Sequence, residues 1–163
     1  MGISYFSITD DYADKIRQSL VDDFGNKVEI NIAGETGYGP CRCCLRQFKP
    51  GETRLLFAYA PVGGNSPYNE TGPVFIHKTC SSYKNRNQFP EEVRNGRMPI
   101  SLVLRCYDNK RRLIAARFVK NNDSIENEIE ALFTNEDIDS IHIRNATYQC
   151  YIAEIRRFQG TGS

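Results

Sequence analysis

Two short pairs of metal-ligand residues constrain this chain more than any other feature. Cys41 and Cys44 form a Cys-x-x-Cys pair, and His77 and Cys80 form a His-x-x-Cys pair after 32 intervening residues. Three thiolates and one imidazole make a complete tetrahedral donor set for zinc, if the fold brings the two pairs together. The intervening segment is longer than in a minimal zinc finger. Zinc would therefore join two loops of a domain that folds around its own core.

The same cysteines allow other interpretations. Cys43 lies inside the first pair, so the choice of ligands among Cys41, Cys43 and Cys44 stays open. Alternatively, Cys44 and Cys80 are small buried apolar side chains, because free cysteine is among the most buried residue types. On that hypothesis the two pairs need no metal.

A third hypothesis is a reactive thiol at Cys41. This residue follows a Gly-Pro turn and precedes Arg42. A neighbouring guanidinium lowers the pKa of a thiol and favours the nucleophilic thiolate. With His77 as a general base, Cys41 would form a Cys/His nucleophile pair, so these two residues are the catalytic candidates.

Arginines near the first pair suggest a binding site for a small anionic ligand. Arg42 and Arg46 carry planar guanidinium groups that suit carboxylate or phosphate, and the glycine-rich segment before them leaves backbone N–H groups free. A later loop adds Tyr68 and Glu70 as further candidates. The alternative is that Arg42 pairs with Glu52 or Glu70 and only locks the loops together.

Composition sets the class of protein. The chain has 40% apolar and 25% charged residues, a composition typical of soluble globular proteins. We expect residues 1–158 to form one domain and 159–163 to be a flexible tail or a cloning remnant. Twenty-one basic against twenty acidic side chains leave a net charge of +1, which predicts no nucleic-acid partner. No apolar run approaches the roughly 20 residues of a membrane span, and no secretory signal is recognisable. We therefore expect no membrane partner and a cytoplasmic location, where six cysteines stay thiols or metal ligands.

Apolar residues repeat with helical spacing in two segments. The first helix has a stripe at Tyr12, Ile16, Leu20 and Phe24 and is expected to end at Gly25. The second helix is expected to start from a capping box of Asp123 and Glu126 and to end near Asn135. A brief helical turn is expected at 90–93, with a stop at Gly96.

Strand patterns fill most of the remaining chain. Val28, Ile30 and Ile32 alternate with polar residues and predict a half-buried strand, and the apolar run 55–60 predicts a strand inside a sheet. Turn residues near 108–110 predict a hairpin between two further strands. Strands are expected at 3–8, 28–32, 55–60, 74–77, 100–106, 113–119, 141–143 and 148–155. Because this order lacks regular βαβα alternation, we predict an α+β fold: a mixed, mainly antiparallel sheet with two helices packed on one face.

Two single residues complete the predictions. Cys106 is in register with Leu102 and Leu104, so we expect it in the core. His142 lies on an alternating strand among charged neighbours, and we expect it at the surface.

The chain resembles a bacterial family of uncharacterised proteins, domain of unknown function 1203. The resemblance extends from about residue 38 to 157 and is carried by several short motifs. These are Pro40-Cys41-Arg42 with Leu45, Gly51-Glu52 before Leu55-Leu56, Ser66-Pro67-Tyr68, Gly72-Pro73-Val74-Phe75-Ile76-His77, Arg144-Asn145-Ala146 and Cys150-Tyr151. The resemblance implies one domain and supplies no function.

The family pattern also bears on the site. It implies that the Pro-Cys-Arg unit is the shared element, and that zinc binding through Cys44, His77 and Cys80 belongs to a subset of members. It further implies that Arg144, Asn145 and Cys150 face the same site from the last hairpin.

The sequence thus predicts a cytoplasmic protein that binds zinc or a small anionic ligand. One alternative is an interaction module with a purely structural Cys3His zinc site, and another is a thiol enzyme that uses Cys41. The expected partner is a small molecule or a protein.

Overall fold

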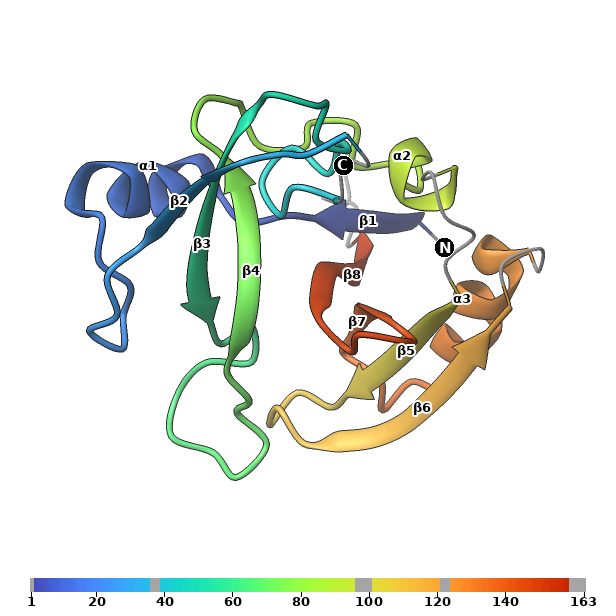
Figure 1. Ribbon diagram of the computed structural model, residues 1–163. Helices are drawn as coiled ribbons and strands as arrows, with labels where there is room; N and C mark the ends of the chain where they lie inside the picture. Colours follow the sequence, from blue (N-terminus) through green and yellow to red (C-terminus); the bar gives the residue numbers. More distant parts are fainter. Residues whose placement is uncertain (1, 36–38, 96–100, 121–123, 159–163) are drawn as a thin grey trace, which may run out of the picture.

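The computed structural model describes residues 2–35, 39–95, 101–120 and 124–158 (Figure 1). Strands dominate this part of the chain, and helices flank them, which confirms the α+β class predicted from the sequence. Several predicted features lie outside the described residues. They are part of the glycine-rich segment before Cys41, the stop at Gly96, the start of the strand at 100, Asp123 of the capping box, and the tail at 159–163.

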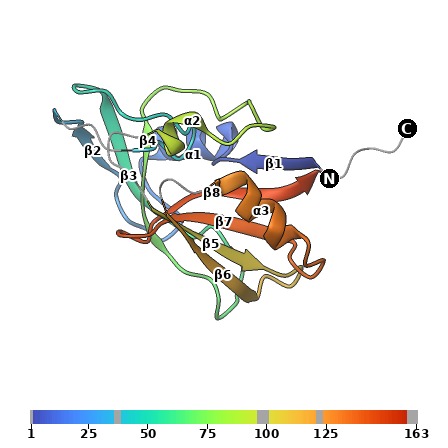
Figure 2. The ribbon, with the colours of Figure 1, turned by 90° about the vertical axis from the view of Figure 1, so that its right-hand side faces the viewer.

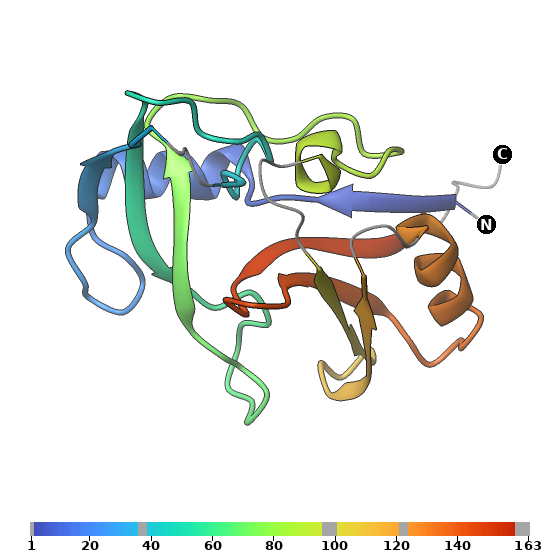
Figure 3. The same cartoon turned by 45° about the vertical axis from the view of Figure 1, so that its right-hand side comes forward.

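The described strands form two sheets, and the larger one has five antiparallel strands in the order β1-β8-β7-β5-β6 (Figure 3). Its strands are β1 (Gly2–Phe6), β5 (Leu102–Tyr107), β6 (Leu113–Val119), β7 (Ser140–Asn145) and β8 (Tyr151–Phe158). β5 and β6 form the predicted hairpin, with Leu102 opposite Val119. β1 pairs with β8, so segments from opposite ends of the described chain are neighbours in this sheet.

The smaller sheet has three antiparallel strands in the order β2-β3-β4. They are β2 (Glu29–Ile32), β3 (Thr53–Tyr59) and β4 (Gly72–His77). β3 is the central strand, as its apolar run predicts. The prediction that Ile30 and Ile32 are half-buried is wrong, because their exposed fractions are 57% and 59%. Alternation predicts an apolar face, but β2 is an edge strand, and no described element covers that face.

The described residues form three helices that flank the sheets: α1 (Asp10–Ser19), α2 (Glu91–Arg94) and α3 (Ile125–Phe133). α1 ends at Ser19, well before its predicted end at Gly25, because Leu20 adopts a left-handed conformation with φ of 54°. The Asp22 carboxylate then accepts the Phe24 N–H and forms a turn in place of further helix. None of the helices in the described part of the chain has the length and apolar character needed to cross a membrane.

Each longer helix packs on its own sheet, whereas both were expected on one face of a single sheet. Ala13 and Ile16 of α1 belong to a core with β3 and β4. Ile129 and Phe133 of α3 belong to a second core with β5, β7 and β8. Figure 2 shows α3 against the larger sheet, with α1 on the far side of the molecule. The apolar stripes predict two amphipathic helices correctly, but a stripe does not identify the sheet that it covers.

The two faces of the larger sheet differ sharply in chemistry. One face, with Leu104, Cys106 and Ile143, packs into the core beneath α3, which confirms the prediction for Cys106. The opposite face holds a buried group that we call the polar face: Tyr107, Ser140, His142 and Arg144. The surface position predicted for His142 is wrong, because the rings of Tyr107 and Tyr151 lie 4.7 Å and 5.2 Å from it and only 1% of the residue is exposed.

Candidate metal centre

The Cys41–Arg46 turn folds tightly through its own backbone. The Cys41 N–H donates to the Arg46 carbonyl at 2.8 Å, and the Leu45 N–H donates to the Cys41 carbonyl at 2.8 Å. Leu45 has a φ of 60°, an uncommon value for a residue with a side chain. Its side chain is nevertheless fully enclosed in the core of the larger sheet, while the cysteines of the same turn lie in the core of the smaller sheet. The turn therefore joins the two cores.

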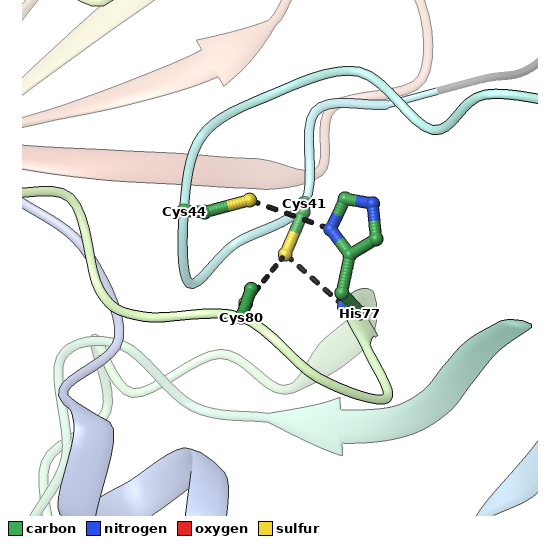
Figure 4. A group of neighbouring side chains, drawn as sticks. All are labelled: Cys41, Cys44, His77 and Cys80. Carbon is green, nitrogen blue, oxygen red and sulfur yellow. Dashed lines mark hydrogen bonds between the residues drawn. The ribbon is translucent and has the colours of Figure 1, made fainter. Parts of the chain in front are cut away.

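Both predicted pairs meet in one cluster, the metal centre, formed by Cys41, Cys44, His77 and Cys80 (Figure 4). One donor atom from each residue lies within 4.8 Å of the other three. Cys41 Sγ and Cys80 Sγ are 3.9 Å apart, and Cys44 Sγ lies 3.3 Å from His77 Nδ1. In a tetrahedral zinc site with Zn–S bonds of about 2.3 Å, two sulfurs lie about 3.8 Å apart. The donor set therefore fits zinc in kind, number and spacing.

The ring of His77 is held on three sides. Its Nε2 atom lies 3.0 Å from Oε2 of Glu52, and its ring packs against Phe48 with a centroid separation of 4.2 Å. This leaves Nδ1 directed at the sulfurs. Metal-bound histidines in proteins commonly pair their second ring nitrogen with a carboxylate in this way, which fixes the tautomer and the ring orientation.

Backbone and side-chain donors surround the sulfurs. The His77 and Cys43 N–H groups point to Cys41 Sγ at 3.2 Å and 3.4 Å. Arg17, in the last turn of α1, places Nη2 3.1 Å from Cys80 Sγ and also donates to the His77 carbonyl. Three thiolates around a dication carry a net negative charge, so these donors and the Arg17 cation would stabilise the loaded centre.

The ionisable groups of the metal centre shift one another's pKa values. Burial raises the pKa of the Cys41 thiol well above its usual range, whereas hydrogen bonds from Cys41 and Cys80 lower that of Cys44. Burial acts to lower the pKa of His77, but contacts with Cys41 and Cys44 outweigh it and raise the value to about 10. Protons and a metal ion therefore compete for the same atoms.

Cys43, the third cysteine of the turn, is not in the converging set. Its thiol is buried beside Cys80 and Arg17, which lower the pKa of that thiol, and its backbone N–H contacts Cys41. Among the candidates that the sequence left open, the geometry favours Cys41 and Cys44 as ligands.

Arg42 has a different environment from its neighbours. Its guanidinium is buried and donates to the carbonyl oxygens of Pro40 and Tyr151. Nη2 lies 3.1 Å from Cys150 Sγ. Its backbone N–H donates to the Phe75 carbonyl of β4 at 2.9 Å, so Arg42 links the turn to both sheets. Among the described residues it pairs with neither Glu52 nor Glu70.

The other predicted ligand-binding residues are dispersed around the turn and the β3–β4 loop. Arg46 lies beside Cys44, which raises the pKa of its guanidinium. Glu70 contacts Arg105 at 2.6 Å and Arg144 at 3.5 Å, while Tyr68 is exposed. The binding role assigned to these residues stays a prediction.

Asn145 and Cys150 flank the turn between β7 and β8. The Asn145 side chain accepts the Thr147 and Tyr148 N–H groups at 2.8 Å and 2.9 Å and so closes that turn. Cys150 contacts Arg42, so the last hairpin does reach the Pro-Cys-Arg unit. The ligand-binding role of Asn145 also stays a prediction.

The catalytic candidates Cys41 and His77 are in contact, but the sulfur is enclosed. Cys41 has no exposed surface, and only 4% of His77 is exposed. Nδ1 of His77 lies 3.3 Å from Cys44 Sγ, so the imidazole is not paired with Cys41 alone. A substrate would have to displace the turn to reach this sulfur.

Sequence patterns did not predict the contacts of Arg17 and Glu52 with the residues of the metal centre. Arg17 carries no local signal, because its role depends on how α1 packs against the β4 end. For Glu52 the sequence suggests a pairing with Arg42 and a place in the Gly51-Glu52 motif, but not a contact with His77. Its nearness to His77 depends on the β3–β4 register, in which Arg54 lies opposite His77 and Glu52 is two residues before Arg54.

Among known proteins, the chain matches one family, over a span that contains the metal centre. No curated protein and no solved structure matches the chain. A family model described as "Protein of unknown function (DUF1203)" matches residues 38–157, a span that starts just before the Cys41–Arg46 turn and ends within β8. All four residues of the metal centre lie inside it. The chain therefore belongs to the DUF1203 family of proteins of unknown function.

Proposed function

We propose that this protein is a zinc-binding α+β domain, and that its zinc is structural. The observation that carries the proposal is the convergence of Cys41, Cys44, His77 and Cys80, with all four donor atoms within 4.8 Å of one another. Two of these donors come from one turn and two from the end of β4 and the segment after it. The metal would therefore fasten two loops that are distant in sequence.

The number of ligands supports a structural role. Catalytic zinc sites keep one position for water or substrate, whereas structural sites are closed by four protein ligands. Here the fourth position is taken by a protein side chain, and three of the four residues are buried. This arrangement favours a structural centre over a hydrolytic one.

The position of the turn also supports this role. Leu45 belongs to the core of the larger sheet, and Cys41 and Cys44 belong to the core of the smaller one. A metal that holds this turn against His77 and Cys80 would stabilise the junction between the sheets. We propose a cytoplasmic location for the protein, because a reducing compartment keeps cysteines as thiols that are available to a metal.

The thiol-enzyme hypothesis has less support. A reactive cysteine needs solvent access and a lowered pKa. Cys41 is fully buried, and burial raises the pKa of its thiol. The interaction-module hypothesis is compatible with structural zinc, and its partner would be another protein.

Metal analysis of cysteine variants tests the proposal. We expect one zinc per chain in protein purified without added metal, measured by elemental analysis. Cys44→Ser and Cys80→Ser should lose it, because serine is a poor zinc ligand. Cys43→Ser and Cys150→Ser are matched controls: each removes one thiol outside the centre, and each should keep the metal.

Two outcomes would contradict the proposal. One is a well-folded wild-type protein that binds no zinc even after incubation with equimolar zinc. The other is retention of stoichiometric zinc by both Cys44→Ser and Cys80→Ser. Loss of zinc from Cys43→Ser alone would reassign the ligand set.

A further inference from the structure

A cleft of about 560 Å³ opens where β1 and β8 of the larger sheet meet α1 and the end of β3. It has the size of a small-molecule site, which is typically about 300–1,000 Å³. It shares no lining residue with the metal centre, so an inference about it stands apart from the proposed zinc. Tyr12, Tyr59 and Tyr151 form a large part of its wall.

The tyrosine rings form a continuous aromatic surface. The centroids of Tyr12 and Tyr59 are 5.3 Å apart, and those of Tyr59 and Tyr151 are 5.6 Å apart. The Tyr12 hydroxyl donates to Asp23, but the Tyr59 and Tyr151 hydroxyls make no hydrogen bond to any described residue. A phenol that is largely enclosed usually has a polar partner. Two of them without one, at the wall of a cleft, indicate groups available to a ligand.

A carboxylate lies beside these phenols. The Glu154 side chain is 16% exposed and lines the cleft. His142 Nε2 at 3.4 Å, Arg156 at 3.1 Å and Arg111 at 3.7 Å all contact its Oε1 atom. Oε2 has no partner among the described residues. The buried imidazole and the two guanidinium groups thus hold the carboxylate in place while one oxygen stays free to accept a hydrogen bond.

The charges around the cleft balance. Its lining contains three basic side chains, Lys84, Arg86 and Arg156, and three acidic ones, Asp10, Asp11 and Glu154. Lys84 is paired with Asp10 at 2.8 Å, and Arg156 is paired with Glu154. A cleft of this kind does not concentrate either sign of charge, so it favours a neutral ligand over a phosphate or an amine.

Hydrogen-bonding capacity identifies the kind of neutral ligand. A phenol both donates and accepts, a carboxylate oxygen accepts, and the Arg86 guanidinium donates. Arg86 stacks 5.0 Å from the Phe6 ring and forms no ion pair with a described residue. Hydroxyl groups also both donate and accept, and the C–H face of a saturated ring packs well on aromatic rings. Polyhydroxylated rings satisfy all of these groups together.

We propose that the cleft between β8, α1 and the end of β3 binds a neutral sugar, with Tyr59, Tyr151 and Glu154 as its hydrogen-bonding groups. The sugar ring would lie against the tyrosine wall. One of its hydroxyls would donate to Glu154 Oε2, and others would pair with the two phenols.

Titration with named sugars tests this proposal. The probes are glucose, galactose, N-acetylglucosamine, maltose and lactose, with glucose 6-phosphate as the charged comparison and sorbitol as the open-chain one. Because the chain has nine tyrosines and no tryptophan, binding at the tyrosine wall should change the intrinsic tyrosine fluorescence. NMR saturation transfer to the sugar gives an independent measurement.

Variants locate the binding. Tyr151→Phe removes one hydroxyl and keeps the ring, so we expect about a 3- to 10-fold weaker affinity. Glu154→Gln should weaken binding by at least as much, because a hydrogen bond to a charged group is stronger than a neutral one. Tyr148→Phe is the matched control, since Tyr148 is 78% exposed and does not line the cleft. It should bind as the wild type does.

Three results would overturn the proposal. It fails if none of the five neutral sugars binds the folded wild-type protein, or if glucose 6-phosphate binds and they do not. It also fails if Tyr151→Phe and Glu154→Gln, both folded by circular dichroism, bind with wild-type affinity. If Glu154→Gln does not fold, Tyr151→Phe alone decides, because it changes neither the charge nor the ring.

Discussion

The metal centre and the polar face are both buried groups of polar side chains, but their atoms are partnered differently. In the metal centre every donor atom has close polar neighbours, such as Cys44 Sγ and His77 Nδ1 at 3.3 Å. On the polar face, four side-chain atoms have no partner in the described structure. They are Tyr107 Oη, Ser140 Oγ, His142 Nδ1 and Arg144 Nε.

The difference indicates what each group requires to satisfy its polar atoms. A buried polar atom without a partner costs about 1–3 kcal/mol. The metal centre needs only one ion to complete it, because its donors already point at one another. The unpartnered atoms of the polar face lie on two neighbouring strands, where enclosed water is the usual partner of such atoms. With zinc bound as proposed, we therefore expect its removal to have a large effect on stability, and single changes on the polar face to have small ones.

Metal removal should give the largest effect. Loss of a structural metal belongs to the changes that destabilise by about 4 kcal/mol or more, which corresponds to about 10 °C in Tm for a chain of this length. Thermal melts with and without a zinc chelator measure it. Cys44→Ser is the control, because it should already melt at the lower temperature and not respond to the chelator. If the wild type melts at the same temperature with and without zinc, the proposed difference between the metal centre and the polar face is wrong.

Glu52→Gln should have the next largest effect. It keeps the shape of the side chain but weakens the contact between the carboxylate and His77 Nε2. Loss of such a partner lowers metal affinity by about 10- to 100-fold. Competition with a zinc chelator of known affinity measures the change. Glu128→Gln, in an exposed pair with Arg117, is the matched control and should bind zinc as the wild type does.

Acid should act on the polar face through His142. Burial lowers the pKa of this imidazole, and the cations Arg144 and Arg111 add to the effect, while Glu154 opposes it. Because the unfolded chain then binds a proton more readily, the free energy of unfolding should fall as the pH drops below about 6.5, by at most about 1.4 kcal/mol per pH unit.

Urea denaturation between pH 7.5 and 5 measures this dependence. His142→Gln removes the titrating group, so the wild type should lose more stability than the variant over the same range. Protonation of the metal ligands is common to both proteins and cancels in the difference. Parallel pH curves would mean that His142 does not titrate differently in the folded protein.

Tyr107→Phe should give the smallest effect. It removes a buried hydroxyl that has no partner among the described residues. The free energy of unfolding should stay the same or rise by up to about 1 kcal/mol. Tyr83→Phe is the contrasting variant, because the Tyr83 hydroxyl donates to the Gln88 carbonyl at 2.8 Å, and its loss should cost about 0.5–1.5 kcal/mol. A clear loss of stability in Tyr107→Phe would indicate an enclosed water bound to its hydroxyl.

The sequence predicted the metal centre better than the polar face, for a physical reason. Cys41 and Cys44 are three residues apart, as are His77 and Cys80. Each pair can therefore be recognised as two neighbouring metal ligands from a short stretch of sequence. His142 has no such local signal. Its burial depends on the rings of Tyr107 and Tyr151, which reach it only because β7 pairs between β5 and β8, so the charged neighbours beside it pointed to the surface.

The fold shows the same division between local and distant information. Helices, the β5–β6 hairpin and the interior strand β3 follow from periodicity and turn residues within each segment. The exposure of Ile30 and the packing of α1 and α3 on different sheets depend on which elements meet in space. Neither the hydrophobic pattern of a strand nor that of a helix contains that information.

The pairing of β1 with β8 has a consequence for how the chain is made. On the ribosome, β1 is synthesised among the first residues described here, but its partner strand appears only after nearly all of the others. The segment that contains α1, the smaller sheet and all four metal ligands is complete by Cys80. Metal binding at these four residues can thus precede the assembly of the larger sheet. Until β8 is synthesised, β1 has no partner strand at the edge where β8 pairs in the folded protein.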